Sequence, residues 1–203
     1  MDKKIYLFRH GITDANHKNL LVGATDVPLA EEGREQSRAM RGIIRKINPG
    51  AVYCSPMMRT EETATIAMNG AGPDIEMDDN IRECDFGQWE MMSWEEAWNN
   101  DKKMALKWSR GDEDFRFPEG ESLAGFLNRI AKFHELLADE DEERVVVFTH
   151  GGVIGQLLCR LLDVPANRHM IFKLPPASMT IIDFHDNVGV LSGICPPSIY
   201  IKE

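Results

Sequence analysis

Cysteine is scarce in this sequence, and its positions exclude two ways of holding a small protein together. Only four cysteines occur among 203 residues: Cys54, Cys84, Cys159 and Cys195. None of them forms a C-x-x-C pair, whereas zinc sites and disulfide frameworks need closer or patterned spacing. We therefore expect free thiols, and we expect neither a metal site nor a cofactor.

Long apolar runs are also missing. No stretch of about 18 apolar residues occurs, and a membrane-spanning helix needs roughly that length. The apolar stretch near the start of the chain, residues 5–8, is too short for a signal peptide. The sequence therefore predicts a cytoplasmic protein with no membrane partner.

Positive charge is in deficit, because the formal net charge is −10 at pH 7. A nucleic-acid partner needs a basic face for its phosphates, so this balance argues against one. A small anion can still bind where a few arginines gather in one cleft.

The residues that are present predict strands that alternate with helices. Residues 3–8, 51–54 and 144–149 are short apolar segments, and the last has the continuous run typical of a buried parallel strand. Helical patterns cover residues 30–47, 60–68, 122–137 and 153–162. The chain is long enough for one large domain. The predicted fold class is α/β, a three-layer α/β/α arrangement around a mostly parallel sheet.

The middle of the chain differs from the rest. All four tryptophans fall in it, at Trp89, Trp94, Trp98 and Trp108. Ser93 and Glu96 resemble a capping box that starts a short helix. We therefore expect a single domain over residues 1–203, in which residues of about 84–121 form a small helical cap over the carboxyl ends of the strands.

The end of the chain predicts two more short strands, at residues 179–184 and 189–191. They would either complete the edge of the sheet or pair with another chain in a homodimer. The pattern does not choose between these arrangements.

Polar residues follow three of the predicted strands directly. Arg9 and His10 follow the first strand, Arg59 lies just beyond the second, and His150 follows the third. The carboxyl ends of parallel strands meet at one edge of a sheet, and ligands bind there. We expect these side chains to form one site.

These residue types supply what phosphoryl transfer needs without a metal. Imidazole is a nucleophile that is largely neutral near pH 7, which suits His10. Arg9 and Arg59 would match phosphate oxygens, and His150 would add charge if cationic. Glu83 would protonate the leaving oxygen and then act as a base towards water. Taken singly, each of these residues also has an ordinary structural explanation.

The chain resembles the histidine phosphatase superfamily, also called phosphoglycerate-mutase-like, over residues of about 3–160. The motifs that carry the resemblance are, in order, Arg9-His10-Gly11; Asn16; residues 23–29 (GATDVPL) with Gly33; Ser55-Pro56-x-x-Arg59-Thr60 with Thr63-Ala64; Glu83 with Phe86-Gly87-x-Trp89-Glu90; Pro118-x-Gly120-Glu121-Ser122 with Arg129; and Thr149-His150-Gly151-Gly152. Ile12 departs from the pattern, because the family often has Glu there, so a polar group at the pocket edge is absent.

The resemblance implies a phosphomonoesterase that acts on a small-molecule phosphomonoester through a phosphohistidine at His10. The implied binding residues are Arg9, Arg59, His150 and Gly151 around the phosphate, Asn16 at the rim and Trp89 beside the leaving group. Glu83 would be the proton donor. The tryptophans would either stack on an aromatic or sugar-like leaving group or form the core of the cap.

Within the superfamily, the resemblance is greatest to α-ribazole phosphatases of the cobalamin pathway. It is carried by residues 86–91 (FGQWEM) and by the short connector from Glu83 to residues 118–122. Phosphoglycerate mutases share the pattern but usually have a longer insertion there, which favours hydrolysis. Two alternatives stay open: a mutase, and a non-catalytic phosphate-binding module.

Four histidines lie outside these motifs: His17, His134, His169 and His185. His17 follows Asn16, which predicts a position near the mouth of the pocket. The other three are expected to be surface or structural residues.

Overall fold

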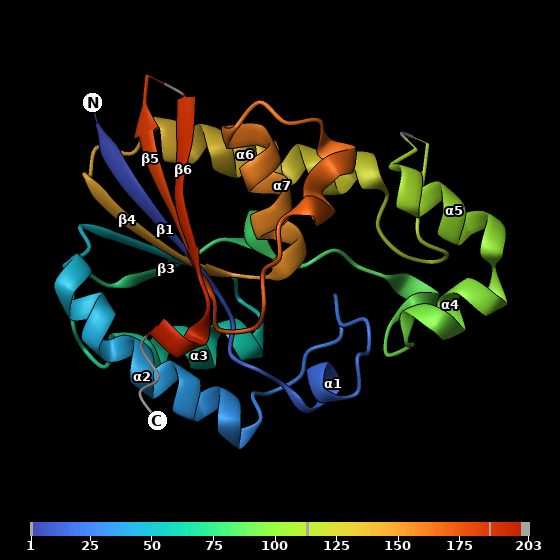
Figure 1. Cartoon of the computed structure of the whole chain (residues 1–203), viewed down its shortest axis with the longest axis horizontal. Helices are drawn as coiled ribbons and strands as arrows, with labels where there is room; N and C mark the ends of the chain where they lie inside the picture. Colours follow the sequence, from blue (N-terminus) through green and yellow to red (C-terminus); the bar gives the residue numbers. More distant parts are fainter. Residues whose placement is uncertain (1, 113, 187, 200–203) are drawn as a thin grey trace.

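A computed structural model describes residues 2–112, 114–186 and 188–199. In these residues a six-stranded sheet has the order β3-β2-β4-β1-β5-β6 (Figure 1). The strands are β1 Lys3–Arg9, β2 Ala51–Cys54, β3 Ile75–Met77, β4 Arg144–Thr149, β5 Met179–His185 and β6 Val188–Cys195. The first four strands in chain order are mutually parallel, and β5 runs antiparallel to both β1 and β6.

Helices cover both faces of this sheet (Figure 1). They are α1 Asp14–His17, α2 Glu31–Ile47, α3 Met58–Met68, α4 Trp94–Asn100, α5 Lys102–Arg110, α6 Leu123–Asp139 and α7 Gly151–Leu161. Short 3-10 segments are η1 Asp79–Ile81, η2 Gly87–Trp89, η3 Ala166–Ile171 and η4 Pro197–Ile199. Apolar residues of α2 and α3 pack on one face, and those of α6 and α7 pack on the other. The predicted fold class, a mostly parallel sheet between helices, is confirmed.

The central strands are apolar over most of their length because their side chains alternate between two cores. Ile5 and Leu7 of β1 belong to the cluster beneath α6 and α7, and Phe8 belongs to the cluster beneath α2 and α3. The parallel register pairs Leu7 with Val147 and Phe8 with Phe148. A strand covered on both faces has no exposed side that would require polar residues. The same register brings the carboxyl ends of β1 and β4 level.

Local signals fix where the main helices begin and end. Helix α2 ends at Asn48, which takes the left-handed conformation with φ 49°. Helix α6 begins after Ser122, whose side chain accepts a hydrogen bond from the N–H of Gly125. Both helices match the predicted segments to within two residues at each end.

The tryptophan-rich segment forms α4 and α5, which lie away from the sheet at one end of the molecule (Figure 1). The predicted capping box is present, because Ser93 accepts from the N–H of Glu96 and the Glu96 carboxylate accepts in return. Asp101 then caps α5 by accepting from the N–H of Met104, and Gly111 ends that helix at φ 68°. The division into one domain with a cap over residues 84–121 stays a prediction.

The far end of the sheet is closed by β5 and β6. Strand β6 pairs with β5 and is longer than the predicted residues 189–191. The two strands complete the sheet edge, and the homodimer alternative stays a prediction.

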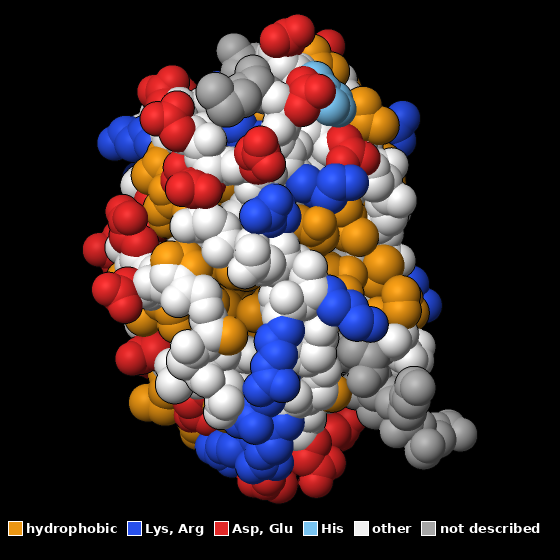
Figure 2. Space-filling model, turned by 90° about the vertical axis from the view of Figure 1, so that its left-hand side faces the viewer, with side chains coloured by type: hydrophobic (Ala, Val, Ile, Leu, Met, Phe, Trp, Pro, Cys, Tyr) orange, Lys and Arg blue, Asp and Glu red, His pale blue; other side chains and the backbone are white. Residues whose placement is uncertain are grey.

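The end of the molecule opposite α4 and α5 carries acidic side chains along one border and a column of basic ones through its middle (Figure 2).

Two findings bear on the expectations drawn from composition. All four cysteines are free thiols, as predicted. Within the part of the chain that the structure describes, no helix has the length and apolar character that a membrane crossing requires.

Candidate active site

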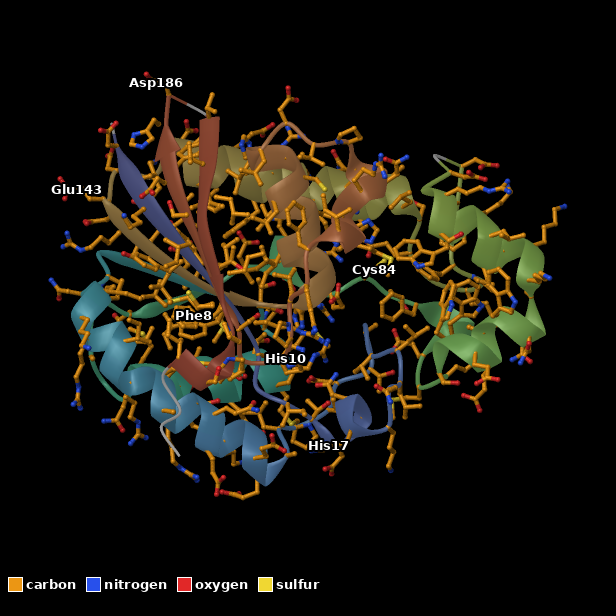
Figure 3. The ribbon with its side chains drawn as sticks, in the orientation of Figure 1. Phe8, His10, His17, Cys84, Glu143 and Asp186 are labelled. Carbon is orange, nitrogen blue, oxygen red and sulfur yellow. The ribbon has the colours of Figure 1, made fainter. Side chains whose placement is uncertain are left out.

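His10 lies just beyond β1, in the middle of the molecule between Phe8 in the sheet and His17 on α1 (Figure 3). Only 4% of its surface is exposed, and its Nδ1 is 2.7 Å from the carbonyl oxygen of Gly11. A carbonyl only accepts, so Nδ1 carries the proton and Nε2 keeps its lone pair. Burial and the charges of Arg9 and Arg59 hold the pKa of His10 well below its ordinary value. The imidazole is therefore neutral, with a free nitrogen.

Two arginines flank His10: Arg9 is partly buried and Arg59 is buried. Arg9 donates from Nη1 to the carbonyl oxygen of Leu174 at 2.5 Å, and its buried Nε has no partner among the described residues. Arg59 is 1% exposed and donates to the carbonyl oxygens of Thr25 at 3.1 Å and Gly23 at 2.9 Å. Buried donors are normally paired, so the unpaired Arg9 Nε indicates a place for an acceptor such as a phosphate oxygen.

Glu90 fixes the loop that holds Arg59. Its carboxylate accepts from the backbone N–H groups of Gly23, Ala24, Thr25 and Phe86 at 3.1, 2.9, 3.2 and 2.9 Å. Gly23 lies so close to the backbone of Cys84 that a Cβ on Gly23 would be 1.8 Å from the Cys84 carbonyl oxygen. Two motifs distant in sequence, residues 23–29 and Glu90, thus act together to orient the Arg59 guanidinium.

His150, directly after β4, is fully buried, and its ring centroid is 5.4 Å from that of His10. Arg59 donates from Nε to His150 Nδ1 at 3.2 Å, which leaves the proton on Nε2, 2.7 Å from Ser55 Oγ. Burial and the adjacent Arg59 hold the pKa of His150 well below its ordinary value. His150 is therefore neutral here, and the positive charge beside His10 comes from the two arginines.

Glu83 lies two residues after η1, with its carboxylate over the start of α7. Its Oε2 accepts from the N–H of Gly152 at 2.9 Å, and its Oε1 accepts from the N–H of Cys84 at 3.0 Å. A Cβ on Gly152 would be 2.4 Å from Glu83 Oε1. The second glycine after His150 is therefore required so that the carboxylate can approach the helix.

Arg129 of α6 anchors the segment that carries Glu83. It forms a two-pronged ion pair with Glu121, from Nε at 2.8 Å and from Nη2 at 2.9 Å. It also donates to the carbonyl oxygens of Asn80 at 2.9 Å and Glu83 at 3.0 Å, and to that of Arg82. The motif residues Glu121 and Arg129 thus act on Glu83 through the backbone.

A pocket of about 550 Å³ opens above these groups. Of the predicted site residues, those that line it are Arg9, His10, Asn16, Arg59, Glu83, Trp89 and Gly151, and His150 lies behind Arg59 and His10. The other walls are mostly apolar and aromatic: Leu20, Leu21, Val22, Phe86, Trp94, Trp108, Phe117, Met170, Phe172 and Leu174. One end of the pocket can hold an anion, and the rest suits an apolar group.

Trp89 belongs to both the core and the pocket. It is 3% exposed and packs edge-on against Phe117, with ring centroids 5.3 Å apart, while it also lines the pocket. The two roles considered for the tryptophans are therefore not exclusive for this residue. Asn16 lines the pocket and uses its Oδ1 to accept from the backbone N–H of Thr13 at 3.0 Å.

No group of three or more His, Cys, Asp or Glu residues within residues 2–112, 114–186 and 188–199 is placed to hold a metal ion. The donors that the pocket offers, two guanidinium groups, match an anionic ligand.

The sequence model of the histidine phosphatase superfamily (branch 1) matches residues 5–195. The chain belongs to this superfamily. It is therefore an enzyme of the phosphoric monoester hydrolase type, and the predicted superfamily membership is confirmed.

Relatives of this histidine phosphatase are named either as phosphatases or as phosphoglycerate mutases. The adenosylcobalamin/α-ribazole phosphatase of Salmonella typhimurium is 27% identical over 98% of this chain and 100% of its own length. A probable phosphoglycerate mutase of Enterobacter sp. (strain 638) is 29% identical over 94% of this chain and 89% of its own. The crystal structure of a phosphoserine phosphatase from Entamoeba histolytica has a TM-score of 0.83, at 25% identity over 96% of this chain and 97% of that one.

Several pocket residues of this histidine phosphatase were not predicted from the sequence. Met170, Phe172 and Leu174 come from the end of η3 and the segment after it, and His169 comes from η3 itself. No motif or periodicity marks this segment. His17, which was expected near the mouth, is exposed, pairs with Glu32 at 3.4 Å and is not among the residues that line the pocket.

Replacing Arg129 in this histidine phosphatase is expected to affect both stability and turnover. In Arg129→Gln the Glu121 carboxylate and three carbonyl oxygens lose their partner, so the free energy of unfolding should fall by about 2–4 kcal/mol. Displacement of Glu83 should lower kcat by about 10- to 100-fold. Urea denaturation and steady-state kinetics measure both effects.

Arg82→Gln is the matched control, because Arg82 lies in the same segment but forms only an exposed pair with Asp79 at 3.3 Å. Its effect on unfolding should stay within about 0.5 kcal/mol. Equal losses in the two variants would contradict the anchoring role of Arg129.

Proposed function

We propose that this histidine phosphatase is a metal-independent phosphomonoesterase that transfers a phosphoryl group to His10 and then to water. The observation that carries the proposal is the neutral, buried His10, which has a free Nε2 and lines the same pocket as Arg9 and Arg59. A nucleophile next to preorganised positive charge is the arrangement that phosphoryl transfer requires.

In the first step, His10 Nε2 attacks phosphorus and the bond to the leaving oxygen breaks. Arg9 and Arg59 bind the phosphoryl oxygens, and Glu83 in its acid form gives its proton to the departing alkoxide. In the second step, a water attacks the phosphohistidine while the Glu83 carboxylate takes its proton. The phosphorus–nitrogen bond then breaks, which releases inorganic phosphate and restores both His10 and Glu83.

The pocket walls favour hydrolysis of an ester with an apolar or aromatic alcohol. Among the described residues that line it, the charged ones are Arg9, Arg59 and Glu83, all assigned to the phosphoryl end. A phosphoglycerate carboxylate would therefore meet aromatic walls without a cation. α-Ribazole 5′-phosphate, an aromatic base on a ribose phosphate, fits such walls and is named for one relative. The mutase alternative rests on the name of the other relative.

Trp94 should contribute to the binding of aromatic esters, because it lines the pocket and is 39% exposed. In Trp94→Ala we expect KM for 1-naphthyl phosphate to rise by about 5- to 10-fold, since one aromatic contact is lost. KM for methyl phosphate should not change. Trp98→Ala is the control. Trp98 lies on the same helix, with its ring centroid 6.1 Å from that of Trp94, but it is not among the residues that line the pocket. A rise for both esters in Trp94→Ala would refute the assignment.

The function is tested by measuring phosphate release in the presence of excess chelator. The panel contains α-ribazole 5′-phosphate, 3-phosphoglycerate, and simple aryl and sugar phosphates. We expect release from the aromatic esters with chelator present and no interconversion of 2- and 3-phosphoglycerate. Loss of activity with chelator would refute the metal-independent mechanism, and efficient interconversion would establish the mutase.

A further inference from the structure

His169 lies in the pocket wall although it belongs to none of the sequence motifs. It is half-buried in η3, and its ring centroid is 5.6 Å from that of Trp108, with the planes tilted by 58°. Both rings line the same pocket as His10 and Glu83. His169 thus places a polar group among otherwise mostly apolar walls.

The position of His169 relative to Glu83 follows from two glycines of α7. Gly152 and Gly155 are three residues apart, so they lie on one face of the helix, about one turn from each other. A Cβ on Gly152 would be 2.4 Å from Glu83 Oε1, and a Cβ on Gly155 would be 3.0 Å from the carbonyl oxygen of His169. Glu83 and His169 therefore rest side by side on this face. A leaving group held against Glu83 is therefore expected to reach His169.

The hydrogen bonding of His169 defines which of its nitrogens can bind a ligand. Its Nδ1 is 3.1 Å from the carbonyl oxygen of Ala166, which only accepts, so Nδ1 carries the proton. Burial lowers the pKa of His169, which keeps the ring neutral near pH 7. Nε2 is then an acceptor, and the one side-chain hydrogen bond that His169 makes to the described residues is through Nδ1.

We propose that His169 is a specificity-determining residue, whose Nε2 accepts a hydrogen bond from a hydroxyl or N–H group of the leaving alcohol. The inference rests on the proposed phosphomonoesterase function and narrows its substrate class. The preferred esters combine an apolar or aromatic part with a hydrogen-bond donor a few atoms from the ester oxygen. A site built around such a contact discriminates against analogues that lack the donor, because the acceptor is then left unpaired.

The proposal is tested with a pair of substrates that differ in one hydroxyl: 4-phenylbutyl phosphate and its 2-hydroxy derivative. In the unmodified enzyme, kcat/KM should favour the hydroxylated ester by about 10-fold, the value of one hydrogen bond. His169→Phe keeps a ring but removes the acceptor, so the ratio should fall to about one. His169→Gln restores an acceptor and should recover part of the preference. His134→Phe, outside this pocket, is the control and should keep the full ratio.

A binding measurement separates this proposal from the proposed reaction. The phosphonate counterparts of the two esters cannot be hydrolysed, and calorimetry gives the ratio of their Kd values. In the unmodified enzyme we expect the ratio of Kd values to favour the hydroxylated phosphonate by the same roughly 10-fold. In His169→Phe the two Kd values should agree to within about a factor of two. Equal ratios in the unmodified enzyme and His169→Phe would overturn the role of His169. A preserved binding preference without any phosphate release would instead overturn the proposed function.

Discussion

His10→Ala is expected to lower kcat/KM by about 10⁴-fold or more for every substrate that the enzyme hydrolyses. The reason is that the imidazole forms the covalent bond to phosphorus, and both ring nitrogens of the neighbouring His150 are engaged by Arg59 and Ser55. Arg9 and Arg59 remain in place and still bind the phosphoryl group. Phosphate release in a coupled assay measures the loss, and the Kd of inorganic phosphate measures the binding that remains.

The control for this substitution is His17→Ala. His17 lies on α1 near the same end of the sheet but is exposed, and its side chain pairs with Glu32. Its removal should change kcat/KM by less than about twofold. Circular dichroism and thermal melting confirm that both variants fold. If His10→Ala kept more than a few per cent of the activity, the phosphohistidine mechanism would be wrong.

Glu83→Gln is expected to have an effect that depends on the leaving group. An alkoxide needs a proton as it departs, so kcat/KM for an alkyl phosphate should fall by about 10²- to 10⁴-fold. A 4-nitrophenolate leaves without a proton, so the same variant should lose less than about 10-fold with 4-nitrophenyl phosphate. The parameter kcat/KM is the appropriate one, because it reports the steps up to the first irreversible event, the loss of the leaving group.

The matched control is Asp85→Asn, two residues away in the same segment. Asp85 accepts a hydrogen bond from the N–H of Gly87 at 2.9 Å and does not line the pocket. The Asp85→Asn substitution should lower kcat/KM for both esters by the same factor. An equal loss with both esters in Glu83→Gln would show that Glu83 positions the substrate and does not protonate it.

The sheet and the main helices could be predicted because their sequence patterns follow from burial. Strand β4 is covered on both faces, which requires the continuous apolar run at residues 145–148. Strand β3 was not predicted, because it has three residues and only Ile75 packs against a core. Helix α5 was also missed, although Asp101 and Gly111 at its ends are recognisable cap residues.

The polar end of the site could be predicted because the parallel register aligns the ends of β1 and β4. Arg9 lies opposite Thr149, which brings His10 beside His150. The neutral state of His150 could not be predicted, because it depends on its burial and on the neighbouring Arg59, which is distant in sequence. The apolar wall from η3 could not be predicted either, since it is formed by residues of a segment without regular periodicity that returns to the site.

The measurement that tests the central claim most directly is the trapping of the phosphoryl intermediate. The enzyme is mixed with a rapidly hydrolysed aryl phosphate, quenched within milliseconds in alkaline denaturant and digested for mass spectrometry. Phosphohistidine survives alkali and is lost in acid. The proposed mechanism predicts acid-labile phosphate on the peptide that contains His10, formed in the unmodified enzyme and absent from His10→Ala. Stable phosphate on another residue, or full turnover with no labelled peptide at any quench time, would contradict it.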